Sequence, residues 1–372
     1  MVPIMIPGTW ILEKIGVRRY LLLGALCNFL GALLKCFSTR PSLFWMTLLG
    51  QFFAGLSAPF IQPLSPQVAR TWFPREMVSR VTSIGVFSMF LGNTLGTIIP
   101  VALVPNVQNK SAIARGLTTM FAGQAIFATI QLVLVLVYFE EKPRTPPSKQ
   151  EAKACIARKS ESYLQSMKNV LNKDFILLLF VYAICGCESN SLLTLLNQLI
   201  LTHFKNDVDL VSLTGFFVNA TSIISTYSIG YIIDKKNCYK LLIFVNYGIS
   251  CFLFFVISLS LWTTNAVLLV AVSATLGFTI NSYPTIIFNF ASELTYPEPE
   301  GVSSSLLVLS SQLASTAATF IVSSIIQYYG VFVANLCYSS LLAFAMFLTI
   351  FIKNNLRSQQ TDINEEAPLL AG

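Results

Sequence analysis

Ten stretches of mostly apolar residues alternate along the chain with short polar segments, and each stretch is long enough to cross a bilayer. A transmembrane helix needs about 20 such residues, and a helix satisfies its own backbone hydrogen bonds in lipid. The pattern therefore predicts an all-α, polytopic membrane protein that is embedded in the lipid bilayer. The expected spans are 20–38, 44–68, 80–104, 116–138, 175–202, 210–232, 239–259, 265–292, 303–328 and 331–352.

One further apolar stretch, Met1 to Leu12, is too short to span the membrane. It also lacks the basic-then-apolar order and the small-residue cleavage site of a signal peptide. We interpret it as the last part of a span whose beginning is missing.

The charged residues, only 11% of the chain, are concentrated in alternate loops. Nineteen of the 24 Lys and Arg residues lie in segments that share one side of the expected spans. Because basic residues accumulate on the cytosolic side of membrane proteins, this side is predicted to be cytosolic. The net charge of +7 then reflects topology, and we expect no nucleic-acid partner. The segments are 13–19, 69–80, 139–174, 234–240, 293–302 and 353–372.

A long polar segment divides the spans into two groups, and each group contains a similar charged turn. Glu13 and Arg18 form the turn in the first group, and Asp234 and Lys235 form it in the second. An acid followed by basic residues at the same place in each half indicates an internal repeat, as in many transporters. The predicted domains are an incomplete N-terminal bundle (1–138), a cytosolic central loop (139–174), a six-helix C-terminal bundle (175–352) and a cytosolic tail (353–372).

These charged turns resemble the loops between helices 2 and 3 and between helices 8 and 9 of the major facilitator superfamily. Further motifs make the resemblance more specific, and together they are similar to the feline leukaemia virus subgroup C receptor family, solute carrier family 49. The likeness extends from about residue 3 to about residue 352. The motifs are Trp72-Phe73-Pro74, Leu103-Val104-Pro105-Asn106, Thr194-Leu195-Leu196-Asn197-Gln198 and the run from Glu293 to Ser304.

The resemblance implies twelve helices in two bundles around a central cavity that opens alternately to each side. It also implies transport of small organic solutes: family members have been linked to choline and ethanolamine, to haem and, in the lysosomal branch, to pyridoxine. Helix 1 and half of helix 2 would be absent, through a shortened gene model or a truncated isoform. The alternative is a non-transporting, receptor-like or regulatory membrane protein.

No pattern in the chain indicates an enzyme or a cofactor. The sequence contains one His and eight scattered Cys, without metal-ligand spacing. It also lacks a nucleophile–base–acid arrangement and a glycine-rich phosphate loop. We therefore expect no catalytic residue, no metal and no cofactor.

Glu188 is the only acidic residue inside an expected span, and it is the first candidate for substrate binding. As an anion it would attract a cationic substrate, and as a neutral acid it would carry a proton. The alternative is a structural carboxyl near the outer mouth that tethers loops through hydrogen bonds.

Other candidates follow from the resemblance and from polar residues beside a proline. Gln312 matches a helix 11 Gln that contacts substrate in the choline-handling members. Their helix 5 Gln is replaced by Phe90, which would offer a face to a cation, and their helix 7 aromatic position falls at Ser189 or Asn190. Asn281 and Tyr283 flank Pro284, although polar residues in spans more often join helices than bind substrate. The expected substrate-binding set is Glu188, Asn190, Phe90, Gln312, Asn281 and Tyr283.

Two short motifs suggest modification and sorting. Asn109 begins a glycosylation sequon in an expected outer loop. Near the end of the chain, Glu365 precedes Leu369 and Leu370, an arrangement that resembles the acidic dileucine signal read by clathrin adaptors. This motif favours the endosomal or lysosomal membrane over the plasma membrane.

Overall fold

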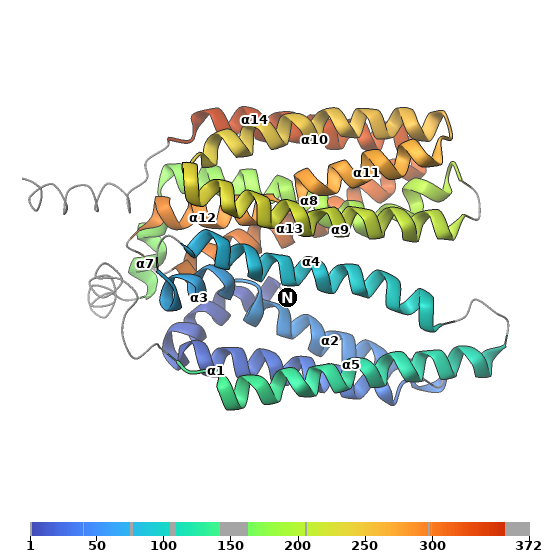
Figure 1. The fold of residues 1–372 in the computed structure, drawn as a ribbon, viewed down its shortest axis with the longest axis horizontal. Helices are drawn as coiled ribbons and strands as arrows, with labels where there is room; N and C mark the ends of the chain where they lie inside the picture. Colours follow the sequence, from blue (N-terminus) through green and yellow to red (C-terminus); the bar gives the residue numbers. More distant parts are fainter. Residues whose placement is uncertain are drawn as a thin grey trace, which may run out of the picture. The chain divides into compact units, whose positions relative to one another are not determined.

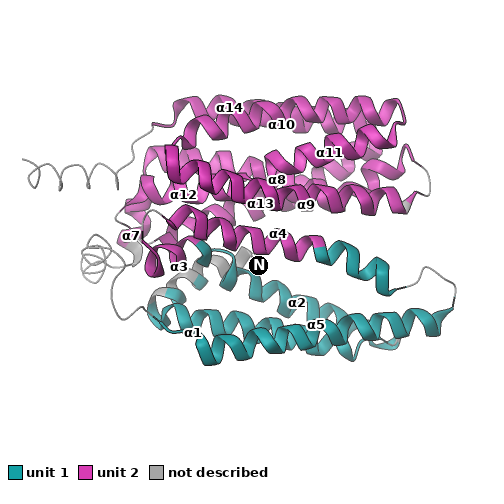
Figure 2. Cartoon of the chain, in the orientation of Figure 1, with its two compact units in different colours: residues 1–65, 95–146 teal, residues 66–94, 147–372 magenta. Residues whose placement is uncertain are grey.

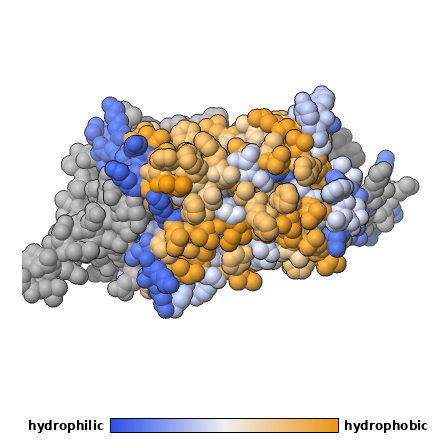
Figure 3. Space-filling model, turned by 90° about the horizontal axis from the view of Figure 1, so that it is seen from above, coloured by the Kyte–Doolittle hydropathy of each residue, from blue (hydrophilic) through white to orange (hydrophobic). Residues whose placement is uncertain are grey.

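A computed structural model describes residues 2–39, 41–74, 77–104, 109–141, 163–204, 207–296, 298 and 300–353. These residues are almost entirely helical (Figure 1), and ten helical stretches among them are long and apolar enough to cross a membrane. The predictions of an all-α class and of ten spans are both confirmed. Many large apolar side chains are exposed on these helices. Figure 3 shows them gathered in the middle of the visible face, with hydrophilic residues at its two ends, as lipid contact requires.

The described helices form two compact units, which we describe separately (Figure 2). Unit 1 comprises Met1–Ser65 and Leu95–Pro146. It contains α1 (Val2–Cys36), α2 (Phe44–Ile61), the last part of α4 (Val78–Leu103) and α5 (Lys110–Tyr138). A short 3-10 helix, η1 (Pro41–Leu43), precedes α2. Within the unit, α1 packs against both α2 and α5.

Glycine allows α1 and α2 to approach closely. A Cβ atom on Gly31 would lie 2.7 Å from the carbonyl oxygen of Gly50, and a Cβ on Gly50 would lie 2.8 Å from the carbonyl oxygen of Gly31. Apolar side chains gain little by leaving lipid for another apolar surface. Close backbone packing of small residues therefore holds membrane helices together.

Unit 2 comprises Pro66–Thr94 and Pro147–Gly372. It contains most of α3 (Leu64–Trp72), the first part of α4, and the helices from α7 onward. Within it, α8 packs along α13, α9 along α11, and α10 along α14. The later helices are α7 (Tyr163–Val170), α8 (Lys173–Leu201), α9 (Val208–Lys236), α10 (Tyr239–Trp262), α11 (Ala266–Ile280), α12 (Tyr283–Thr295), α13 (Glu300–Tyr329) and α14 (Val331–Phe351).

Two expected spans are each built from two helices. The span predicted at 265–292 consists of α11 and α12, which are separated at Asn281 and Ser282, and Pro284 is the second residue of α12. The span predicted at 44–68 consists of α2 and α3, which are separated at Gln62 and Pro63. Proline has no backbone N–H and clashes with the preceding turn, so it interrupts the helical hydrogen bonds at both places.

The structure divides the chain at places other than the expected domain boundaries, because segment 66–94 packs with the later helices. Helix α7 lies within the expected central loop. The expected bundles at 1–138 and 175–352 remain predictions. The tail beyond residue 353 lies outside the described residues.

Candidate functional site

Arg70 on α3 is the centre of an ionic cluster at the expected cytosolic end of unit 2. Its guanidinium donates a 2.7 Å hydrogen bond from Nη2 to Ser292 Oγ. The same group lies 3.5 Å from Glu293 Oε1 and 3.4 Å from Glu300 Oε1. The side chain of Arg70 is 13% exposed and that of Glu300 is 3% exposed, so the charges are largely removed from water. The cluster therefore joins α3 to α12 and α13.

A second ion pair joins α4 to α9 in the same unit. Arg80 Nε donates a 2.8 Å hydrogen bond to Asp234 Oδ2. One turn before Asp234, Gly230 allows α4 to approach, because a Cβ there would overlap the side chain of Ser83. The ammonium group of Lys235 lies 4.4 Å from the ring centre of Tyr231 on its own helix, a cation–π contact. Asp234 of the expected second charged turn thus bonds to another helix.

The first charged turn is held within unit 1 by Glu141, a residue that the sequence reasoning missed. Glu141 accepts hydrogen bonds of 2.7 and 2.9 Å from the backbone N–H groups of Val17 and Arg18. A carboxylate is favoured there because the N–H groups at a helix start lack partners. Arg18 also donates from Nη2 to the carbonyl oxygen of Leu136, at 3.0 Å. The side chain of Glu13 lies outside the described residues.

A glycine conformation produces the bend at which this carboxylate sits. Gly16 has φ 82° and ψ 166°, which interrupts α1 between its short first part and its membrane-spanning part. A Cβ at this position would overlap the carboxylate of Glu141. The bend therefore requires glycine both for its backbone angles and for space.

Glu188 lies in the interior of unit 2, at the middle of α8, and is 1% exposed. Neither of its carboxylate oxygens has a hydrogen-bond partner among the described residues. It lies within electrostatic range of Tyr247 on α10, Tyr283 on α12 and Tyr338 on α14. A direct contact with substrate would therefore require α8 to move or this carboxyl to become exposed.

Asn281 and Tyr283 are also buried inside unit 2, where they join helices. Asn281 donates a 2.6 Å hydrogen bond from Nδ2 to Ser222 Oγ, which links the end of α11 to α9. Tyr283 is stacked on Tyr247 with ring centres 4.4 Å apart, and its hydroxyl lies 3.3 Å from Ser250 Oγ. Both arrangements fit the helix-joining alternative and leave these two side chains little access to a solute.

Asn190 and Gln312 remain accessible on two helices that pack together. Asn190 on α8 is exposed, and Gln312 on α13 is partly buried. The two helices cross closely beside them, because a Cβ on Gly186 would lie 2.7 Å from the carbonyl oxygen of Ser311. Asn190 lies one helical turn beyond Gly186, and Gln312 directly follows Ser311. The crossing therefore places both polar side chains in one region of unit 2.

Phe90 lies on the face of α4 that carries Ser83 two turns earlier, and it is 4% exposed. Its ring is therefore buried in this structure.

Arg70 and Arg80 form the ion pairs described above. Sequence reasoning did not name either arginine. The available signal was the family motif from Glu293 to Ser304, which contains both acidic partners of Arg70.

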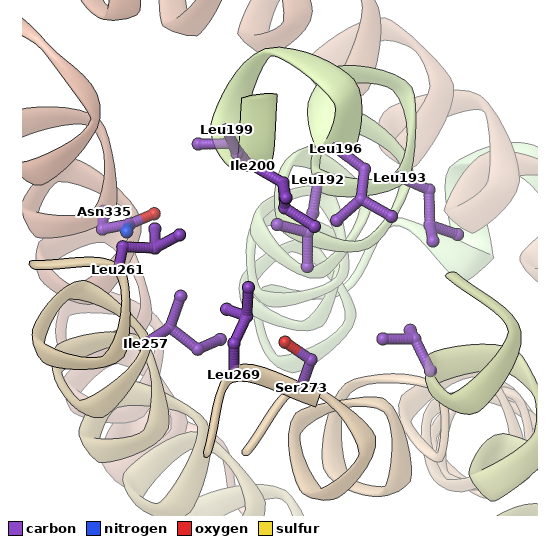
Figure 4. A pocket seen from close by; sticks show the side chains of 11 residues that line it. Leu192, Leu193, Leu196, Leu199, Ile200, Ile257, Leu261, Leu269, Ser273 and Asn335 are labelled. Atoms are coloured by element: carbon purple, nitrogen blue, oxygen red, sulfur yellow. The ribbon is translucent and has the colours of Figure 1, made fainter. Parts of the chain in front are cut away.

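A small cavity lies between α8, α9, α10 and α11 of unit 2, with Asn335 of α14 at one side (Figure 4). Its volume is about 20 Å³, which is enough for a single water molecule and too small for an organic solute. Leu192, Leu199, Leu261 and Leu269 are among its lining residues. Within the described ranges, no group of three or more His, Cys, Asp or Glu residues could hold a metal ion.

The expected glycosylation site is exposed at the start of α5. Asn109 caps this helix and accepts hydrogen bonds from the backbone N–H and the hydroxyl of Ser111. The proposed sorting residues Glu365, Leu369 and Leu370 lie outside the described residues.

Comparison with solved structures supports the same fold. The chain is similar to the Escherichia coli proton:xylose symporter XylE, with a TM-score of 0.74 at 15% identity over 96% of this chain and 86% of XylE. It is also similar to the Escherichia coli fucose:proton symporter FucP, with a TM-score of 0.70 at 12% identity over 94% and 87% of the two chains. At these identities the similarity concerns the fold alone.

Sequence comparison is more specific. The family model named Major Facilitator Superfamily matches residues 1–319. The choline/ethanolamine transporter flvcr2a of Danio rerio is 36% identical over 97% of this chain and 77% of its own length. Human choline/ethanolamine transporter FLVCR2 is 32% identical over 97% and 69%. An MFS-type transporter of Caenorhabditis elegans, C09D4.1, is 33% identical over 95% and 61%. The chain therefore belongs to the major facilitator superfamily, a superfamily of transporters and not of enzymes, and is homologous to the FLVCR family of solute carrier family 49.

Proposed function

We propose that this protein transports a small organic cation of the choline or ethanolamine type by alternating access. The observation that carries the proposal is 32–36% identity to choline/ethanolamine transporters over almost the whole chain. The accessible amides of Asn190 and Gln312 support it, because they offer hydrogen-bond acceptors to a hydroxyl or an ammonium group. No comparison favours haem or pyridoxine, and these remain members of the substrate panel.

In this proposal the candidate residues have two different roles. Asn190 and Gln312 contact the solute near the crossing of α8 and α13, and Phe90 supplies a ring face if α4 exposes it during the cycle. Glu188, Asn281 and Tyr283 act from inside unit 2, because their burial leaves no room for a solute beside them.

The two ion-pair groups of unit 2 set the conformational preference. Arg70 with its two acidic partners, and Arg80 with Asp234, hold α3 and α4 against α9, α12 and α13 at the expected cytosolic end. Opening a path to the cytosol at this end requires these pairs to separate. They therefore stabilise the cytosol-closed state. The second charged turn contributes through Asp234, and the first contributes through the backbone N–H groups of Val17 and Arg18, which Glu141 binds.

Uptake of labelled choline, ethanolamine, pyridoxine and haem into proteoliposomes tests the proposal. We expect saturable uptake of choline and ethanolamine, with each competing against the other. Asn190→Ala and Gln312→Ala should raise the KM, because each removes a polar contact to the solute. The matched control is Gln327→Ala. Gln327 is an exposed Gln on α13, the helix that carries Gln312, and its replacement should leave the KM unchanged.

Two results would contradict the proposal. Folded protein that moves neither choline nor ethanolamine, in net uptake or in exchange, would favour the alternative of a receptor-like or regulatory protein. Equal KM values for all three variants and the wild type would show that neither Asn190 nor Gln312 contacts the solute.

We further propose that the acidic dileucine at Leu369 and Leu370 directs the protein to endosomes or lysosomes through a clathrin adaptor. The support is the motif itself, with Glu365 four residues before the first Leu, on the expected cytosolic side. Replacing both leucines by Ala should move a tagged protein to the cell surface. An unchanged distribution would contradict this address.

A further inference from the structure

The interior of unit 2 contains a carboxyl group that the helix packing leaves without a partner. Glu188 is 1% exposed, and both of its oxygens lack a hydrogen-bond partner among the described residues. An ionised carboxylate without a partner in a low-dielectric interior is strongly unfavourable. In the packing described here, the site therefore suits the neutral, protonated acid.

Among the described residues of the surrounding helices, no cation faces this carboxyl. The titratable groups within its electrostatic range are Cys185 and Cys187 of α8, Tyr247 and Cys251 of α10, Tyr283 of α12 and Tyr338 of α14. Tyr182 of α8 lies close to Cys185 and completes the group. Helix α11 has no titratable residue, those of α13 lie at its ends, and on α9 the tyrosines nearest to mid-helix are exposed.

The tyrosine hydroxyls around Glu188 are already engaged, so they are poor candidates for holding a metal ion. Tyr247 donates to the carbonyl oxygen of Val181 at 2.7 Å, and Tyr338 is paired with Ser191 Oγ at 2.7 Å. A sodium or calcium ion would need several free oxygen ligands beside the carboxylate. A proton needs only the carboxylate and a donor that can reach it.

A row of polar groups runs from Glu188 toward the outer end of the same helices. Ser191 lies three residues further along α8, one turn toward that end, and is bonded to Tyr338. Asn335 lies one turn beyond Tyr338 on α14, is 1% exposed, and neither polar atom of its amide has a partner in the described part of the chain. Figure 4 shows this amide and the hydroxyl of Ser273 directed into the small cavity.

The cavity can complete this row with a water molecule. Its volume of about 20 Å³ holds one water, and a buried water needs two or more polar partners. Asn335 and Ser273 are the polar side chains among the cavity's lining residues and could bind such a water. Polar side chains thus lie on successive turns of α8 and α14 between the outer end of these helices and Glu188.

We propose that Glu188 binds a proton that is cotransported with the solute, and that Asn335, a cavity water and the Ser191–Tyr338 hydroxyl pair conduct this proton from the outer end of unit 2. On binding, a hydronium ion gives its proton to the carboxylate, which forms the acid and leaves water. On release, the acid returns the proton to water and becomes a carboxylate. One proton moves and no other reactant is needed.

The same geometry links the proton site to the proposed solute contacts. Gly186, two residues before Glu188, touches the backbone of Ser311 where α8 and α13 cross. Burial of an ionised Glu188 is unfavourable, so ionisation favours a shift of α8 that exposes the carboxylate. Such a shift would be transmitted at this crossing to α13, next to Gln312. Asn190 follows on the same segment of α8. Protonation therefore favours the packed arrangement around the solute contacts.

This inference depends on the proposed function, and two measurements keep the two apart. The first uses proteoliposomes with a pH-sensitive dye inside and labelled choline outside. Wild-type protein should acidify the lumen as choline enters, and uptake should rise when the outside pH is lowered. Glu188→Gln should abolish both effects, and Tyr338→Phe and Asn335→Leu should slow the acidification several-fold. Tyr328→Phe, an exposed Tyr of α13, is the control and should behave as the wild type.

The second measurement needs no transport. Infrared spectra of the purified protein should contain a protonated-carboxyl band that disappears in Glu188→Gln. Choline uptake by wild-type protein without acidification, or uptake that requires sodium, would overturn proton cotransport while leaving the proposed function intact. Absence of the infrared band would overturn the protonated state of Glu188 whatever is transported. Failure of choline and ethanolamine exchange, with the band present, would overturn the proposed function and leave the proton site in place.

Discussion

Removing the positive charge of Arg70 gives the most direct test of the ion pairs at the expected cytosolic end. The substitution Arg70→Met keeps much of the side-chain volume but leaves Glu293 and Glu300 without their common cation. Breaking a buried ion pair from one side costs about 3–5 kcal/mol. Because the guanidinium is 13% exposed and water partly replaces it, we expect about 2 kcal/mol here. This corresponds to about a 30-fold shift toward the open state.

The ion pair of Arg80 provides a control inside the same unit. Its side chain is 39% exposed, so solvent already screens its interaction with Asp234. Exposed ion pairs contribute about 1 kcal/mol or less. We therefore expect Arg80→Met to shift the opening equilibrium less than about tenfold.

Cysteine labelling measures this opening. Thr295 at the end of α12 is 2% exposed, so Thr295→Cys should react slowly with a maleimide applied from the cytosolic side. Arg70→Met should speed the labelling about 30-fold, in proportion to the population of the open state. The parent protein without Thr295→Cys gives the background from native thiols, and a thermal melt shows that each variant is folded.

Charge removal on the other side of the pairs makes the test stringent. Adding Glu293→Gln and Glu300→Gln to Arg70→Met removes the two negative charges that Arg70 had paired and should restore slow labelling within a few-fold. Labelling of Arg70→Met that is no faster than that of Arg80→Met would refute the reasoning from burial. A triple variant that labels as fast as Arg70→Met would refute the electrostatic cause.

Three further predictions concern single positions. Gly16→Ala should destabilise the protein by about 1–3 kcal/mol, because φ is 82° there and a facing carboxylate occupies the space of the new Cβ. The control is Gly123→Ala, because a Cβ on Gly123 would meet nothing within 4 Å, and it should be neutral or slightly stabilising in a thermal melt. Equal melting temperatures of Gly16→Ala and Gly123→Ala would contradict the strain expected at Gly16. Gly186→Ala should separate α8 from Ser311, cost about 1–3 kcal/mol and lower choline uptake; unchanged melting and uptake would show that the crossing can relax. Asn109→Gln should remove a glycan and increase electrophoretic mobility, whereas unchanged mobility would exclude its use.

The spans could be predicted from the sequence because lipid constrains each helix by itself. A segment such as 239–259 needs only its own length and apolarity to be assigned, and α10 (Tyr239–Trp262) covers it. The helix breaks next to Pro63 and Pro284 were not assigned from the sequence, because a proline does not always end a helix: α2 and α4 continue through Pro59 and Pro100. The bend at Gly16 was not predicted, because a glycine does not show from sequence whether its φ is positive.

Site residues were harder to assign because their roles depend on neighbours that are distant in the chain. Glu188 was identified as the one acid within a span, but its position between α10, α12 and α14 was not visible in the sequence. Glu141 was missed because it lies 123 residues along the chain from Arg18, whose backbone N–H it binds. Asn335 was missed as well, since a lone amide in an apolar segment gives no signal until its lack of partners is known.

The sequence by itself determined the class, the number of spans, the expected sidedness and the family, because each depends on local composition or on motifs that are continuous in the chain. The tertiary structure alone decided which charges meet and which polar groups are enclosed. Arg70 and Glu300 are separated by most of the chain yet lie 3.4 Å apart. The energy of such a pair depends on distance and on exclusion of water, and both quantities exist only after the helices have packed.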